Sequence, residues 1–253
     1  MIRNVLVAIG EMPHEKNAFE YAGHLAVLLD AHLSCVFFQD GGNPSQEDIA
    51  NRVLEHTEAQ FAEYDFLDAH AEAITGKRTE MICQKARSAD LVVIGLPKSI
   101  KTDGLKLVHD QIDDILFNLT KPAIVVHEDC TLLRKILAVH RDDRYSDHVL
   151  ELAAELGERT EASLVGLALA ETEIKAAQII QQMKDYLQFH DVEAEFMTML
   201  GFTVANILDT AAANDCDLIS LSASHHGRLY EMIFQSTTET VVKLANRAVM
   251  VTR

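Results

Sequence analysis

The residues best suited to chemistry lie in one polar loop in the second half of the chain. A buried strand is expected over Leu218–Leu221, followed by a polar loop at Ser222–Arg228 and an amphipathic helix that begins near Ser236. A turn from a strand into a helix often binds phosphates in open α/β sheets, because backbone amides of the first helical turn point at the anion. The adjacent histidines His225 and His226 lie in this loop.

Two kinds of site could use the histidine pair. His140 is expected to end another strand of the same half, and Arg141 follows it, so these side chains could line one crevice with His225 and His226. Zn²⁺ would need three or four nitrogen, sulfur or carboxylate ligands, whereas an anion would use protonated histidines and the arginine. No H-x3-H or C-x2-C spacing supplies further metal ligands. The simpler interpretation is that one histidine faces solvent while the other caps or packs, and we expect no metal.

No catalytic signature accompanies the loop. The motifs G-x-S-x-G, G-x-x-x-x-G-K-[ST], G-x-G-x-x-G and H-E-x-x-H are absent from the sequence. Ser236 and Glu239 have the form of a capping box, which accounts for both residues without a ligand; contact between Ser236 and a phosphate is the alternative. Since no pair of nucleophile and base is visible, we predict that the protein is not an enzyme.

Net charge, apolar runs and cysteine spacing indicate which partners and which compartment the protein is expected to have. The chain has 253 residues and a net charge of −17, and this charge disfavours nonspecific binding to nucleic acid and to anionic lipid surfaces. No apolar run approaches the roughly 18 to 20 residues of a membrane span, and the sequence begins directly with a strand-like segment, so we expect a cytoplasmic protein. The four cysteines are far apart and form no C-x-x-C pair, which favours reduced thiols.

Strand-like and helical segments alternate along the whole chain. The predicted strands cover residues 5–9, 33–38, 71–74, 90–95, 123–126, 135–140, 162–169, 192–197, 218–221 and 249–252. Helices are expected between them; the one at 172–189 carries an apolar stripe that we expect to pack, made of Ile174, Ala177, Ile180, Met183 and Leu187. This order predicts an α/β fold with doubly wound, mostly parallel five-stranded sheets and a functional crevice at the carboxyl ends of the strands.

The second half of the chain repeats the first. A shift of 131 residues sets Val5 and Leu6 on Ile136 and Leu137, and a shift of 127 sets Asp90 on Asp217. The boundary falls near residues 127–133, which gives one domain at 1–130 and another at 131–253. Two similar halves on so short a linker should pack as a pseudo-twofold pair, and the last strand of each half could also serve in a homodimer.

With this order of elements, and with the segment A-D-L-V-V-I-G at Ala89–Gly95, the chain resembles the universal stress protein family in its tandem two-domain form. The resemblance covers almost the whole length and implies the fold of the adenine-nucleotide α-hydrolases. Nucleotide-binding members carry G-x2-G-x9-G-(S/T) after the fourth strand and an Asp at the end of the first strand. The glycines let backbone amides close on the phosphates.

Both halves depart from that pattern. In the second half the three glycine positions and the final hydroxyl are Ser222, His225, Gln235 and Ser236, and the Asp position is Arg141. In the first half the corresponding residues are Gly95, Lys98 and the pair His109-Asp110, with Gly10 at the Asp position. Side chains at glycine positions would fill the phosphate channel, so the resemblance implies degenerate nucleotide-binding motifs and we expect no cofactor.

We therefore expect a stress-response protein that acts through contacts with an unknown protein partner or through a weakly bound small ligand. One alternative is a member that binds ATP or AMP at a modified site in the second half. Another is a metal or anion sensor at the loop that contains His225 and His226.

Overall fold

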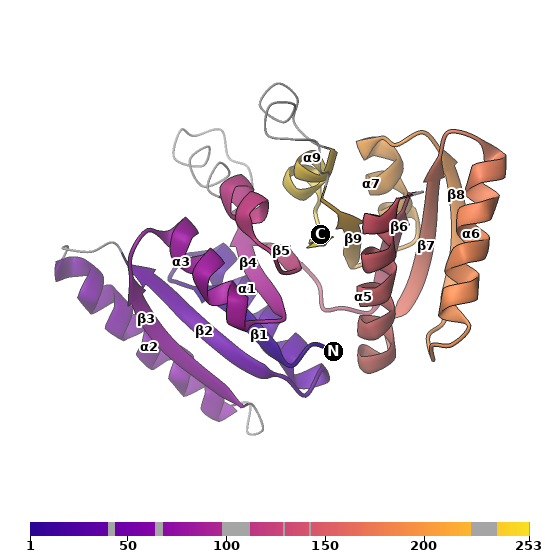
Figure 1. The fold of residues 1–253 in the computed structure, drawn as a ribbon. Coiled ribbons are helices and arrows are strands. Elements are labelled where there is room, and N and C mark those ends of the chain that lie inside the picture. The colour runs from indigo at the N-terminus through magenta and orange to yellow at the C-terminus, as the bar shows by residue number, and fades with distance from the viewer. Residues whose placement is uncertain are drawn as a thin grey trace. The chain divides into compact units, whose positions relative to one another are not determined.

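The computed structural model describes residues 1–39, 44–63, 68–97, 112–128, 130–141, 143–223 and 237–252. They form two compact units, Met1–Cys130 and Thr131–Arg253, and each unit is a twisted sheet with helices packed on it (Figure 1). The alternation of strands and helices confirms the predicted α/β fold in two tandem halves.

The first unit follows the predicted order of elements. It contains β1 (Asn4–Ile9), α1 (Pro13–Leu28), β2 (His32–Gln39), α2 (Pro44–Glu63), β3 (Ala69–Thr75), α3 (Arg78–Lys85), a 3₁₀ turn (Ala86–Ser88), β4 (Leu91–Leu96), a helix at 112–118 and β5 (Ala123–His127). Within the unit the strand order is β3-β2-β1-β4-β5, and every neighbouring pair is parallel. The carboxyl ends of all five strands therefore lie at one edge of the sheet.

The second unit has the same path. It contains β6 (Lys135–His140), α5 (Arg144–Thr160), β7 (Ser163–Ala170), α6 (Glu173–Leu187), β8 (Ala194–Leu200), α7 (Val204–Ala213), β9 (Leu218–Ser222), α9 (Thr237–Leu244) and β10 (Ala248–Thr252). Its strand order is β10-β9-β6-β7-β8, again with parallel neighbours. The strand order reverses between β6 and β9, and open α/β sheets bind ligands outside the carboxyl ends of the strands at such a point.

One aspartate in each unit fixes the amino ends of the two central strands. In the first unit Asp90 Oδ2 accepts hydrogen bonds from the backbone amides of Arg3, at 2.9 Å, and Asn4, at 3.1 Å. In the second unit Asp217 Oδ2 accepts from the amides of Arg134, at 3.0 Å, and Lys135, at 3.1 Å. The two halves thus use the same contact to join β1 to β4 and β6 to β9.

The buried face of α6 differs from the predicted stripe. Met183 and Leu187 are buried as predicted. The predicted Ile174 is 75% exposed, Ala177 is exposed and Ile180 is only partly buried, and Ala176 and Ile179 are buried in their place. Both sets have helical spacing, so the sequence pattern alone allows either face. Met183, which belongs to both sets, packs over Gly166 of β7, where an added Cβ would lie 2.7 Å from Met183 Cε.

The segment that forms β8 is displaced toward the carboxyl side of its prediction. A strand was expected over 192–197, but β8 pairs with β7 from Leu164↔Ala194 to Ala170↔Leu200. The prediction missed Met199 and Leu200 because β8 ends the order of this sheet and its residues are only half-buried or exposed. Such a strand has weak apolar alternation.

The four cysteines are free thiols. Burial raises the pKa of the Cys216 thiol to about 11 and also raises that of Cys35. Neither thiol is therefore activated as a nucleophile.

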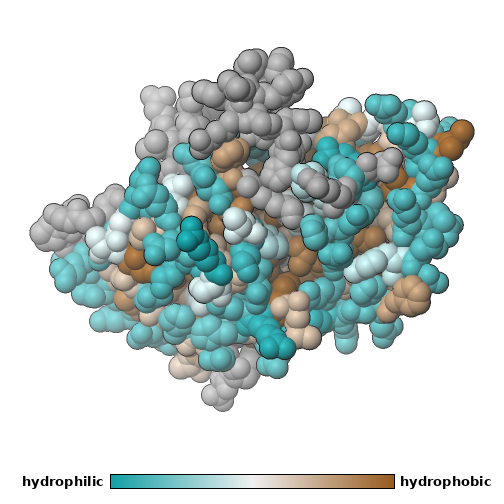
Figure 2. Space-filling view, in the orientation of Figure 1, coloured by the Kyte–Doolittle hydropathy of each residue, from teal (hydrophilic) through white to brown (hydrophobic). Residues whose placement is uncertain are grey.

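Hydrophilic side chains cover much of the visible face of each unit, as the negative net charge leads one to expect (Figure 2). In the part of the chain that the structure describes, no helix is both long enough and apolar enough to cross a membrane.

Candidate functional site

Arg141 lies at the carboxyl end of β6 and reaches toward the end of β9. Its Nη2 donates a hydrogen bond to Ser222 Oγ at 3.0 Å, and its Nε lies 3.2 Å from Asp143 Oδ2. The guanidinium carbon also lies 4.4 Å from the centre of the Phe202 ring. Contacts with three separate segments hold this arginine, of which 23% of the side chain is exposed, at the carboxyl ends of the two central strands.

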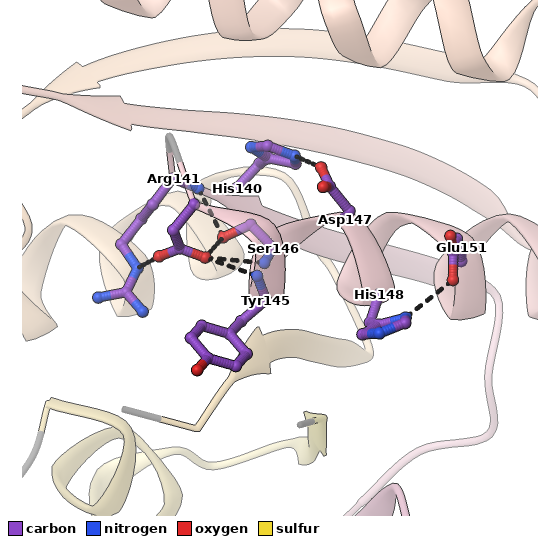
Figure 3. Close-up of polar contacts among 8 residues, drawn as sticks. His140, Arg141, Tyr145, Ser146, Asp147, His148 and Glu151 are labelled. Carbon is purple, nitrogen blue, oxygen red and sulfur yellow. Dashed lines mark hydrogen bonds and ion pairs between the residues drawn. The ribbon is translucent and has the colours of Figure 1, made fainter. Parts of the chain in front are cut away.

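Asp143 pairs with this arginine and also caps the amino end of α5, near Tyr145 and Ser146, which are labelled in Figure 3. Its Oδ1 accepts hydrogen bonds from the amides of Tyr145, at 3.1 Å, and Ser146, at 2.9 Å, and from the Ser146 hydroxyl at 3.0 Å. Ser146 Oγ in turn accepts from the Arg141 amide at 3.0 Å. The turn from β6 into α5 is therefore closed by side chains of its own, and its first helical amides are already paired.

Ser222 is a buried residue that ends β9. It is 3% exposed, and its carbonyl oxygen accepts a hydrogen bond from Thr238 Oγ1 of α9 at 2.9 Å. The hydroxyl and the carbonyl oxygen of Ser222 thus both have partners within the second unit. Ser222 stands at the first glycine position of the family pattern, and its side chain fills space that a glycine would leave empty. Its hydroxyl contacts Arg141, which stands at the Asp position.

His140 lies next to Arg141 but has different surroundings. Its Nε2 is 3.4 Å from Asp147 Oδ1 of α5, and its side chain is 4% exposed (Figure 3). Burial holds the pKa of His140 below the ordinary histidine value, although Asp147 and Asp143 favour the charged ring. His140 and Arg141 therefore have different partners. The suggestion that they line one crevice with His225 and His226 stays a prediction, because those two histidines lie outside the described residues.

His140 forms the floor of a cavity of about 560 Å³ between α5 and α6. Its lining is mostly polar and consists of His140, Asp143, Asp147, Leu150, Glu151, Gln182 and Tyr186. Glu151 is engaged by His148, whose Nδ1 lies 2.9 Å from Glu151 Oε2. This cavity does not include Arg141 or Ser222, so it is separate from the contact between those two residues.

In the first unit, Gly95 remains at the first glycine position of the pattern and Gly10 stands at the Asp position, and both are tightly covered. A Cβ on Gly95 would lie 2.1 Å from the carbonyl oxygen of His14, in the first turn of α1. A Cβ on Gly10 would lie 1.9 Å from Glu15 Oε2. The Glu15 carboxylate is held by Arg78 Nη1 at 2.7 Å and by the Met12 amide at 3.2 Å.

Several predicted site residues lie outside the described residues. These are Lys98, His109, Asp110, His225, His226, Gln235 and Ser236. The metal candidates His225 and His226 and the capping role of Ser236 therefore stay predictions. Among the described residues, no group of three or more His, Cys, Asp or Glu side chains is placed to hold a metal ion, and His140 instead pairs with Asp147.

Sequence reasoning missed the partners that hold Arg141 in place. Asp143 could have been recognised, because an Asp three residues past a strand and just before an amphipathic run is a helix N-cap signal. Phe202 gives no such signal, since its contact with Arg141 joins residues from two separate turns. The pair of Glu15 and Arg78 joins α1 to α3 and is equally invisible in the local pattern.

Comparison with known structures supports the fold. A universal stress protein from Archaeoglobus fulgidus superposes with a TM-score of 0.80 at 16% identity, covering 99% of this chain and 96% of the other. A functionally unknown protein from Pseudomonas aeruginosa gives a TM-score of 0.73 at 16% identity, with coverage of 99% and 92%. The cytoplasmic domain of a prokaryotic cation chloride cotransporter gives 0.53 at 13% identity, with coverage of 99% and 95%.

Sequence comparison decides the family. No curated protein matches the chain significantly. The family model described as the universal stress protein family, however, matches it twice, at residues 1–127 and 133–253. The chain therefore belongs to the universal stress protein family, with one family domain in each half.

Proposed function

We propose that this chain is a non-enzymatic, cytoplasmic universal stress protein whose second unit has lost the ordinary ATP site of its family. It would act in the stress response through contacts with protein partners or through a weakly bound small ligand. The observation that carries the proposal is the hydrogen bond between Arg141 and Ser222, the residues at the Asp and first glycine positions, whose Nη2 and Oγ atoms are 3.0 Å apart.

The chemistry of this contact argues against an adenine nucleotide held in the family's manner. An Asp at the end of the first strand would offer an acceptor, whereas Arg141 offers only donors. A glycine at position 222 would leave a backbone amide open to a phosphate, whereas the Ser222 side chain occupies that space and is itself a partner of Arg141. Moving the arginine aside would also break its contacts with Asp143 and Phe202.

The glycines of the first unit give no independent support for a nucleotide. Gly95 has a structural reason to be glycine, since its Cβ would overlap the backbone of α1, at 2.1 Å from a carbonyl oxygen. An Asp at position 10 would meet the Glu15 carboxylate that Arg78 holds. The space for a carboxylate beside the end of β1 is thus taken by a residue of α1.

The test is thermal unfolding of the full chain with ATP or AMP, with and without Mg²⁺. A ligand that binds only the folded state stabilises it by RT ln(1 + [L]/Kd), or about 2.7 kcal/mol at a hundredfold excess over Kd. We expect no change in melting temperature at millimolar nucleotide. A rise would refute the loss of the site.

A second candidate function, nucleotide binding at a modified site, is favoured by one observation. Arg141 places a partly exposed guanidinium at the end of the central strands, where it could meet a phosphate. This candidate predicts a nucleotide-dependent rise in melting temperature that Arg141→Ala abolishes. Arg159→Ala is the matched control, because Arg159 has a similar exposure and pairs with Glu155 within α5.

A further inference from the structure

A cavity of about 120 Å³ lies in the first unit between α1 and α2, beside the end of β1. Its apolar lining consists of Ile9 from β1, Phe19 from α1 and Val53 from α2, all of which are buried. An engineered cavity of about 150 Å³ with aliphatic and aromatic walls binds benzene. The volume and the walls of this cavity therefore suit a molecule built on one aromatic ring.

Thr57 of α2 adds a hydroxyl group to this apolar lining. The residue is 4% exposed, and no group in the described part of the chain forms a hydrogen bond with its side chain. The helical residues Thr160 and Thr210 differ, because each hydroxyl donates to a carbonyl oxygen of the preceding turn. Buried polar groups are rarely left without a partner. The unpaired hydroxyl of Thr57 therefore indicates a hydrogen-bonding group on the molecule that fills the cavity.

The exposed part of the lining carries charges of both signs. It includes Lys16 and Arg52 as cations and Glu11 and Glu20 as carboxylates. Arg52 Nη2 already pairs with Glu11 Oε1 at 3.1 Å, and Glu15, a buried carboxylate of the lining, is held by a cation of α3. Since these charges balance, they favour a neutral ligand over an ion.

We propose that this cavity binds a small neutral aromatic molecule that carries one hydroxyl or N–H group, as phenol does. The ring packs against the apolar lining, and the polar group forms a hydrogen bond with Thr57 Oγ1. The described residues that line the cavity include Gly10 but none from β2 or β4. The site therefore lies apart from the glycine positions at and after the end of β4.

The corresponding place in the second unit is also hollow. A shift of 131 residues sets Ile9 on His140 and Phe19 on Leu150, and both of these line the cavity of about 560 Å³ between α5 and α6. The gap between the first two helices thus recurs in both units, but its lining in the second unit is mostly polar. A ligand with one apolar ring should therefore bind the first unit alone, with one molecule per chain.

This proposal deepens the proposed function and rests on it, because it names a class and a place for the weakly bound small ligand. Titration of the full chain with phenol, followed by nuclear magnetic resonance of methyl groups, tests it. We expect saturable shifts of the Ile9 and Val53 methyl signals, since a ring in the cavity would contact both side chains, and none of the Leu150 signals. Val53→Phe should abolish the shift at Ile9 by filling the cavity.

Thr57→Val tests the hydrogen bond, because it keeps the shape of the side chain and removes the hydroxyl. It should weaken phenol binding about fivefold, the effect of one neutral hydrogen bond, and should leave benzene binding unchanged. Thr210→Val is the matched control. It removes a buried helical hydroxyl of the second unit and should leave both titrations unchanged.

The proposal is overturned if phenol gives no saturable shift at Ile9 and Val53, or if Val53→Phe leaves the phenol titration unchanged, which would place phenol elsewhere. It is equally overturned if Thr57→Val affects phenol no more than benzene. Nucleotide is absent from these titrations, so a negative result refutes this site alone. A nucleotide-dependent rise in melting temperature would refute the loss of the ATP site whatever phenol does.

Discussion

Replacing Gly95 by Ala separates a packing role of this glycine from a phosphate-binding role. The added Cβ would lie 2.1 Å from the carbonyl oxygen of His14 and 3.1 Å from the amide nitrogen of Glu15, both backbone atoms of α1. Relief of the first contact requires α1 to move by about 1 Å relative to β4. Overpacking of this kind costs about 3 kcal/mol, the upper end of its usual range, because no flexible side chain can move instead.

Urea and thermal unfolding in the absence of nucleotide measure this cost. We expect Gly95→Ala to lower the stability of the first unit by about 3 kcal/mol, or its melting temperature by roughly 10 °C. Gly23→Ala is the control with the opposite sign: an added Cβ there meets nothing within 4 Å, and Ala in a helix is about 0.5–1 kcal/mol better than Gly. If the free energy of unfolding of Gly95→Ala lies within about 0.5 kcal/mol of that of the parent, the packing argument is refuted. So small a change is typical of substitutions on the surface, not of an overlap with backbone atoms.

Three further outcomes follow from the contacts described above. Arg78→Met should lower the free energy of urea unfolding by about 3 kcal/mol, because it leaves the Glu15 carboxylate, 7% exposed, without its cation. Arg52→Met removes an exposed ion pair and should lower this free energy by less than about 1 kcal/mol. Equal losses would contradict the stabilising role of the pair of Arg78 and Glu15. Asp143→Ala should cost about 1–2 kcal/mol by removing the N-cap of α5, measured as a lower denaturation midpoint, and an unchanged midpoint would argue against the cap. Burial lowers the pKa of His140 from 6.5, so below about pH 6.5 the unfolded chain binds more protons than the folded chain, and the free energy of unfolding should fall as the pH drops. His140→Asn should flatten this pH dependence. An identical pH profile in the variant would show that other groups cause it.

The order of strands and helices could be predicted because buried segments are apolar in sequence. Central strands covered on both faces, such as β1 and β4, must be apolar throughout, and each reads as a continuous run. The face of α6 was predicted only in part: Met183 and Leu187 are buried as expected, but Ala176 and Ile179 lie beside Ala177 and Ile180 in the sequence, and the apolar spacing allows either pair. Strand β8 was misplaced for a related reason, since a half-exposed strand carries little apolar signal.

For the candidate site, the sequence predicted which residues lie at the strand ends but not which atoms they contact. The family resemblance places Arg141 and Ser222 at neighbouring strand ends, and their side chains are in fact hydrogen-bonded. Which groups hold the arginine depends on the conformation of turns far away in sequence, as with Phe202. The contact between His32 Nε2 and His70 Nδ1, which are 2.8 Å apart, was also missed, because strand register is needed to bring the two residues together and a shift of one residue would place them on opposite faces.

The aspartates at the amino ends of the central strands have a consequence for engineering. Asp90 and Asp217 make the same pair of hydrogen bonds in the two halves, whereas the residues at the carboxyl ends, Gly95 and Ser222 among them, differ between the halves. The alignment of the central strands is thus fixed at their amino ends in both units. Sequence changes at the carboxyl ends leave this contact intact, so each aspartate can serve as the fixed anchor when the unit is used as a scaffold.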